Sequence, residues 1–158
     1  EADAVWTRRT GLACAVLTAD CLPILLCADS GDEIAAVHAG WRGLAAGIVA
    51  ATLSRLQTRP EGLLAWLGPA IGPDAFEVGD EVREAFVSLH ADSASAFTAS
   101  RPGHWLADIY ALARTHLAAA GVTQVHGGEF CTFSDSERFF SYRRDGMTGR
   151  MATLIWLE

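Results

Sequence analysis

Apolar and polar positions divide the chain into short strand-like segments and longer helix-like ones. Compact apolar runs rich in β-formers predict strands over 13–18, 22–27, 34–38, 63–67, 123–126 and 151–157. Apolar residues at helical spacing predict helices over 44–56, 80–89 and 105–120, the last closed by Gly121. The Gly- and Pro-rich stretch 68–73 predicts a shaped loop, and the polar stretch 90–103 predicts a surface loop.

The turn sequence Asp29-Ser30-Gly31-Asp32 lies between two of these strands and predicts a hairpin of 22–27 with 34–38. Such a hairpin is antiparallel, whereas strands interleaved with helices favour parallel pairs. We therefore expect one domain over 1–158, of the α/β (α+β) class. Its sheets should be mixed, with helices packed outside them.

The composition excludes several classes of function. All twelve cations are Arg, the net charge is −7, and neither Lys nor Asn occurs. Lysine Schiff bases and a phosphate-binding P-loop are therefore excluded, and nucleic acid is not an expected partner. An anionic ligand would have to be held by Arg, by backbone N–H groups or by a metal.

The cysteines and apolar runs predict a cytoplasmic protein that does not enter the membrane. Four Cys occur without a CxxC pair, which favours a reducing compartment. No apolar run reaches eighteen residues, and no signal peptide is recognised at the N-terminus. The sequence does not indicate an oligomeric state.

The predicted hairpin brings a thiol and an imidazole together. Counting outward from the turn places Pro23 opposite His38 and Cys21 opposite Gly40. Diagonal neighbours of this kind share one face, with Cα atoms about 7–8 Å apart. Cys21 and His38 therefore form a candidate site for zinc or copper, whose ligands include thiolate and imidazole.

Other interpretations of these residues stay open. Cys21 could be a nucleophile activated by His38, without a metal. A free cysteine also commonly packs in a core, and we assign that role to the other three. Asp20 is a candidate general base or a partner that orients the imidazole, and Arg42 is a candidate anion-binding residue beside the hairpin mouth.

A second cluster follows Phe139 and includes Tyr142, Arg143 and Arg144 before Gly146. Two guanidinium groups next to aromatic side chains suit an anionic or planar ligand. On spacing alone, we favour the simpler interpretation of a loop whose Arg–Asp pair faces solvent. Arg143 is kept as the second candidate for substrate binding.

Four motifs and a C-terminal segment together resemble the YfiH-like family, also called the multicopper polyphenol oxidoreductase or purine nucleoside phosphorylase family. In chain order they are Thr18-Ala19-Asp20-Cys21-Leu22-Pro23, His38-Ala39-Gly40-Trp41-Arg42-Gly43, Leu67-Gly68-Pro69-Ala70-Ile71-Gly72-Pro73, Phe140-Ser141-Tyr142-Arg143-Arg144-Asp145 and Gly149-Arg150-Met151-Ala152. The resemblance covers the whole chain. It implies a layered α-β-β-α fold in which Cys21 and His38 are two of three metal ligands.

The same resemblance implies that the family's third ligand is absent from 1–158. That ligand is a His in a Gln-Val-His-Gly motif upstream of Cys21, in a region that would precede Glu1. We therefore expect a single YfiH-like domain that is N-terminally incomplete relative to the family. Gln124-Val125-His126-Gly127 has the same letters. By family order it lies before Cys131, so we interpret His126 as a coincidence.

The leading hypothesis from the resemblance is a zinc-dependent purine nucleoside phosphorylase. It would convert inosine or adenosine and phosphate to the free base and ribose 1-phosphate, with adenosine deamination as an additional activity. Asp20 and Cys21 would be catalytic, Arg42 and Arg143 would bind substrate, and Cys21 and His38 would hold the metal. The alternatives are a copper-dependent polyphenol oxidase (laccase), a cysteine-type hydrolase that edits peptidoglycan precursors, and a chain without enzymatic activity.

Overall fold

The main sheet has five strands and is mixed, as the sequence predicts. The structure is a computed structural model that describes residues 2–158. From one edge to the other, the strands are β1 (Ala4–Thr7), β4 (Ile34–Ala39), β3 (Leu22–Ala28), β5 (Leu63–Leu67) and β9 (Gln124–Gly127). The β5–β9 pair is parallel and the other pairs are antiparallel.

In the described residues 2–158, two smaller sheets and five α-helices accompany this sheet. The small sheets pair β10 (Met151–Ile155) with β2 (Cys14–Thr18), and β8 (His104–Ala107) with both β6 (Glu77–Gly79) and β7 (Phe97–Arg101). The helices are α1 (Trp41–Ala45), α2 (Ile48–Leu53), α3 (Asp80–Val87), α4 (Ile109–Ala119) and α5 (Tyr142–Asp145), and 3₁₀ turns cover Pro60–Gly62 and Ala91–Ala96. Within residues 2–158, no helix combines the length and the apolar character needed to cross a membrane.

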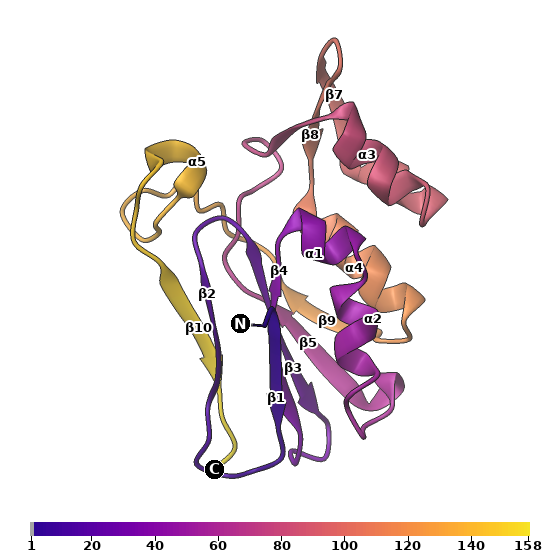
Figure 1. Cartoon of the computed structure of the whole chain (residues 1–158), viewed down its shortest axis with the longest axis vertical. Coiled ribbons are helices and arrows are strands. Elements are labelled where there is room, and N and C mark those ends of the chain that lie inside the picture. The colour runs from indigo at the N-terminus through magenta and orange to yellow at the C-terminus, as the bar shows by residue number, and fades with distance from the viewer. Residues whose placement is uncertain (1) are drawn as a thin grey trace.

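The main sheet lies between a layer of helices and the β2/β10 ribbon (Figure 1). The larger core joins apolar side chains of β3, β4 and β5 to those of α1, α2 and α4. A smaller core on the opposite face joins Cys14 and Val16 of β2 to Ile34 and Ala36. These two cores fix the main sheet against its neighbours on both faces.

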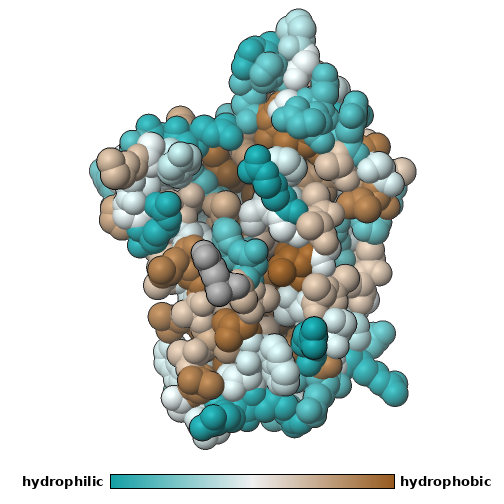
Figure 2. Space-filling view, viewed as in Figure 1, coloured by the Kyte–Doolittle hydropathy of each residue, from teal (hydrophilic) through white to brown (hydrophobic). Residues whose placement is uncertain are grey.

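The ribbon also carries exposed apolar surface. Figure 2 shows apolar patches over this side of the molecule. Leu17, Leu154 and Trp156 are all more than two-fifths exposed there. The ribbon therefore covers the small core with one face and presents apolar side chains on the other.

The predicted hairpin is confirmed residue by residue. Pro23 pairs with His38, Leu22 pairs with Ala39, and the Ala28 N–H donates to the Glu33 carbonyl oxygen across the turn. The register is the expected one because the turn has the length that its four polar residues predict.

Two predicted helices are wrong in extent. The helix expected over 44–56 is divided into α1 and α2 because Gly47 adopts a left-handed conformation with φ of 87°. The helix expected from Trp105 begins only at Ile109, where the Asp108 side chain accepts from the N–H groups of Tyr110 and Ala111. Trp105 itself lies in β8.

The predicted surface loop 90–103 also has more structure than expected. It contains a 3₁₀ turn and β7. Strands β6, β7 and β8 form, with α3, an arm that projects beyond the end of the main sheet (Figure 1). The pairing partner of β7 is β8, which the sequence placed in a helix.

Glu33 is a buried carboxylate that joins the hairpin turn to the segment after α2. Its side chain is 1% exposed. It accepts hydrogen bonds from the backbone N–H groups of Gln57, at 2.9 and 3.0 Å, and Thr58, at 2.8 Å. Burial by itself raises the pKa of Glu33, but these hydrogen bonds outweigh it and the net pKa lies below the ordinary 4.5.

We predict that Glu33→Gln lowers the free energy of unfolding by about 1–3 kcal/mol at pH 7. The folded pKa lies below the unfolded one, so the carboxylate's stabilisation is complete above about pH 5.5 and is lost as the pH falls below the ordinary value of 4.5. Urea denaturation from pH 7 to pH 3 measures the difference. Glu137→Gln, at an exposed position, is the control and should be neutral. Equal stability of Glu33→Gln and the parent at pH 7 contradicts the assignment.

Candidate functional site

A cleft of ≈ 740 Å³ lies at the end of the main sheet, between α5 and the arm. Its walls come from the β2–β3 connection, the end of β4, the start of α1, the arm and α5. Figure 2 shows the outline of the molecule hollowed between the last two of these parts. All five candidate residues line this cleft: Asp20, Cys21, His38, Arg42 and Arg143.

Cys21 and His38 converge at Gly40. A Cβ atom on Gly40 would lie 3.0 Å from the Cys21 sulfur and 3.8 Å from His38 Nε2. The thiol and the imidazole therefore border the same small space, which is open only because residue 40 has no side chain. This is the arrangement that the hairpin register predicts.

Asp3 fixes the orientation of the imidazole. Its carboxylate accepts from His38 Nδ1 at 3.0 Å, which leaves Nε2 for the side of the ring that faces the thiol. The hydrogen bond with Cys21 raises the pKa of His38 to about 9; burial opposes this shift and Asp3 adds to it. The raised pKa favours a protonated imidazole at neutral pH, with the Asp3 carboxylate as its acceptor.

Asp20 connects four segments around the cleft. It is 9% exposed and has a left-handed backbone with φ of 87°, a conformation that Asp tolerates better than most residues. Its carboxylate accepts hydrogen bonds from the Thr132 hydroxyl at 2.6 Å, the Ser141 hydroxyl at 3.0 Å and the backbone N–H of Arg143 at 2.7 Å. Its carbonyl oxygen accepts from the Ile71 N–H.

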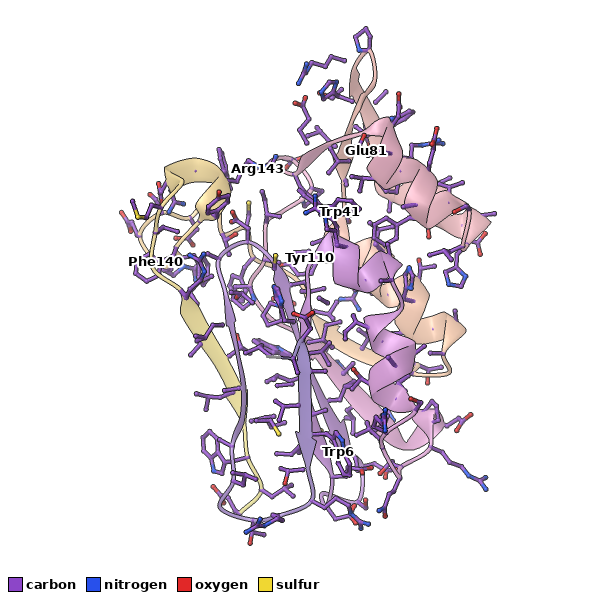
Figure 3. All side chains as sticks on the ribbon, in the orientation of Figure 1. Trp6, Trp41, Glu81, Tyr110, Phe140 and Arg143 are labelled. Atoms are coloured by element: carbon purple, nitrogen blue, oxygen red, sulfur yellow. The ribbon has the colours of Figure 1, made fainter. Side chains whose placement is uncertain are left out.

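The two candidate guanidinium groups approach from opposite walls. Arg42, in α1, lies 4.5 Å from the centre of the Trp41 ring. Arg143, in α5, reaches toward the arm, where it donates to the Glu77 carbonyl oxygen at 3.0 Å and lies 5.6 Å from the Phe76 ring centre. Figure 3 places Trp41, Glu81 and Arg143 around this opening.

The predicted shaped loop 68–73 forms the floor beside Asp20. Tyr110 of α4 holds it, because the phenol accepts from the Ala70 N–H at 2.7 Å and donates to the Phe130 carbonyl oxygen at 2.8 Å. Burial raises the pKa of Tyr110 to about 12, so the phenol keeps its proton. No local signal in the sequence links Tyr110 to this loop.

Three basic residues of the cleft were not predicted to bind substrate: Arg101, His104 and Arg150. Arg101 pairs with Glu77 at 2.8 Å, and its hydrogen bond lowers the pKa of Glu77 to about 2. Arg101 is therefore already neutralised. Arg101 and His104 belong to the unpredicted β7–β8 pair, whereas Arg150 belongs to a segment that the family resemblance includes.

The donors partly fit a metal ion. A thiol and an imidazole whose other nitrogen is hydrogen-bonded to a carboxylate are typical of zinc ligands. A catalytic zinc commonly has three protein ligands. Among residues 2–158, no cluster of three His, Cys, Asp or Glu side chains is placed to hold an ion. His126 is exposed on β9 and does not line the cleft.

Comparison with known proteins places these residues in a family. The model of the family described as "Multi-copper polyphenol oxidoreductase laccase" matches residues 1–158. A purine nucleoside phosphorylase of Pseudomonas aeruginosa is 61% identical over all of this chain, and the purine nucleoside phosphorylase YfiH of Escherichia coli is 57% identical over 99% of it. The chain spans 66% and 64% of those two relatives' lengths.

Solved structures agree. The fold matches a Neisseria meningitidis protein with a TM-score of 0.98 and 51% identity, covering 100% of this chain and 65% of that one. It matches YlmD of Geobacillus stearothermophilus with a TM-score of 0.92 and 36% identity, covering 98% of this chain and 60% of that one. The chain therefore belongs to the YfiH family, the multi-copper polyphenol oxidoreductase laccase family of the matching model.

Proposed function

We propose that this chain carries the activity of a purine nucleoside phosphorylase. The observation that carries the proposal is one cleft that holds a thiol–imidazole pair and two guanidinium groups, in a chain 61% identical to a protein of that name. The chain spans 59–66% of the lengths of eight curated relatives that it matches. The activity for which these longer relatives are named is therefore proposed for this chain.

The reaction needs an anion site beside a nucleoside site. A phosphate oxygen forms a bond to C1′ of the ribose, the bond from C1′ to N9 of the purine breaks, and its electron pair leaves with the base. The proton lost by phosphate goes to the departing base, so inosine and phosphate give hypoxanthine and ribose 1-phosphate. Charge accumulates on the base as the bond breaks, and donors fixed in advance stabilise it.

In this cleft, Arg42 and Arg143 are the residues that would hold phosphate. They come from opposite walls, and guanidinium groups suit the paired oxygens of phosphate. Trp41 and Tyr142 line the same cleft and offer flat apolar surface for a purine. Adenosine is expected to bind like inosine, and its deamination belongs to the same proposal.

Cys21 and His38 would hold a zinc ion, with copper as the alternative. The metal would supply a Lewis acid that polarises an oxygen of the substrate or of phosphate. The protein's own part is to keep the imidazole in one orientation through Asp3 and to keep the thiol beside it at Gly40.

Turnover tests the proposed activity and the role of Cys21. Purified protein of measured zinc and copper content, incubated with inosine and phosphate, should release hypoxanthine and ribose 1-phosphate. Cys21→Ala should lower this rate by more than about 100-fold, since even a partner outside the ligand shell is worth roughly 10–100-fold. Cys27→Ala is the matched control: this cysteine lies in the same hairpin but packs toward the ribbon, so the rate should be unchanged.

The same preparation distinguishes the alternatives. Oxidation of a phenolic dye without formation of ribose 1-phosphate would show the laccase activity for which the family is named. Release of ammonia from adenosine without phosphate would show deamination alone. Cleavage of an amide substrate that persists in a chelator, but stops on alkylation of Cys21, would show a cysteine hydrolase. Each of these results without phosphorolysis contradicts the proposal.

A substitution at Gly40 tests the space that Cys21 and His38 share. Gly40→Ala places a methyl group 3.0 Å from the Cys21 sulfur, so the thiol must move. A displacement of about 1 Å can cost roughly 100-fold in rate, so a shift of a few tenths of an ångström should cost less, about threefold to tenfold, together with weaker zinc binding. Gly43→Ala is the control, since its new methyl would have no neighbour closer than 3.7 Å. Equal zinc affinity and turnover in both variants would contradict a shared role for Cys21 and His38.

A further inference from the structure

The carboxylate of Asp20 is already occupied by donors of the protein. One oxygen accepts from the Thr132 hydroxyl, and the other accepts from the Ser141 hydroxyl and the Arg143 N–H. Both hydroxyl-bearing residues are fully buried. A general base must come within hydrogen-bonding reach of the proton that it removes. Asp20 could do so only by giving up bonds that hold the surrounding segments.

These bonds determine where Arg143 lies. The backbone N–H of Arg143 donates to the Asp20 carboxylate at 2.7 Å. Its guanidinium group donates to the Glu77 carbonyl oxygen at 3.0 Å. The side chain thus spans the cleft from α5 to the arm (Figure 3). Its Nη1 bond to Glu77 leaves other N–H donors of the guanidinium group available to an anion.

The hydrogen bond from the Arg143 backbone to Asp20 also places Arg143 relative to Cys21. Asp20 and Cys21 are adjacent in the chain, and the left-handed backbone of Asp20 turns its carboxylate toward α5 while Cys21 faces His38. Ser141, which bonds to the same carboxylate, also accepts from the Arg144 N–H at the start of α5. One side chain therefore connects the hairpin mouth to the first turn of the helix that carries Arg143.

We infer that Asp20 is a positioning residue that acts through Arg143, and is not the general base. Its carboxylate sets the guanidinium group opposite the thiol–imidazole pair, where phosphate would bind. The inference rests on the proposed function, because Arg143 matters only if the cleft takes an anion. It deepens that proposal by assigning the carboxylate a role in phosphate affinity.

Charge repulsion and positioning predict opposite changes in phosphate affinity. A carboxylate near an anion site repels the anion, so replacing Asp20 by a neutral residue should strengthen phosphate binding if charge alone mattered. Positioning predicts the opposite, since Arg143 is released. Asp20→Asn is the informative variant because Asn tolerates the left-handed backbone and keeps the size of the side chain.

The experiment is calorimetric titration of inorganic phosphate at fixed ionic strength into the parent, Asp20→Asn, Arg143→Ala and the double variant. We expect Asp20→Asn and Arg143→Ala each to weaken phosphate binding by about tenfold. Asp20→Asn should have no further weakening effect once Arg143 is absent, because residues that act through one contact are not additive. Asp135→Asn, which removes a partly buried carboxylate paired with Arg138, is the charge control and should not weaken phosphate binding.

The outcomes separate the two proposals. Unchanged or tighter phosphate binding by Asp20→Asn, with weaker binding by Arg143→Ala, overturns the positioning role and leaves the anion site standing. Unchanged binding by Arg143→Ala overturns the anion site and the inference with it. Additive losses in the double variant also overturn the inference, since they show that Asp20 acts independently of Arg143.

Turnover with inosine supplies a second measurement. It distinguishes positioning from a purely structural role by the kinetic parameter that changes. Positioning raises KM for phosphate while KM for inosine and kcat at saturating phosphate stay close to the parent values. Loss of a base lowers kcat at saturating phosphate and would contradict positioning. Thr132→Val removes one bond to the carboxylate without changing its charge, and should reproduce a smaller rise in KM for phosphate. Thermal melting of each variant confirms that it is folded.

Discussion

The site depends first on the register of one β-hairpin. Pro23 lies opposite His38, so the strands leave the hairpin with Cys21 and Gly40 side by side at its mouth. A slip by one residue would turn the thiol and the imidazole to opposite faces of the sheet, because side chains alternate along a strand. Buried apolar side chains on both faces of β3 and β4 make such a slip costly.

A second constraint joins this hairpin to the rest of the cleft. Asp20 bonds through its side chain to residues 132, 141 and 143, and through its carbonyl oxygen to residue 71. A left-handed backbone at a non-glycine residue costs on the order of 1–3 kcal/mol, and four hydrogen bonds of a buried group offset that cost. The strained residue is thus the point at which separate segments meet.

The walls of the cleft differ in how firmly they are held to the rest of the fold. The hairpin and the helix layer share the large core. The arm and α5 enclose the cleft from either side and are bridged across it by Arg143, through one hydrogen bond to a carbonyl oxygen and contact with an aromatic ring. Such a bridge can yield to a ligand without disturbing the core, which suits the proposed binding of a nucleoside and phosphate.

The sequence by itself determined the mixed α/β class, the hairpin and the pairing of Cys21 with His38. These follow from local signals: apolar periodicity, a four-residue turn and a count of residues outward from it. It failed where a single residue overrode periodicity, as at Gly47, and where a helical pattern began inside a strand, as at Trp105.

Only the tertiary structure decided how Asp20, Arg143, Thr132 and Tyr110 meet. Thr132 and Arg143 bond to Asp20 across more than a hundred residues of chain, and Tyr110 reaches a loop forty residues away. No periodicity encodes contacts at such separations, because they arise when independently formed elements pack together. The hairpin carries its geometry in its own residues, whereas the opposite wall of the cleft exists only once the whole chain has folded.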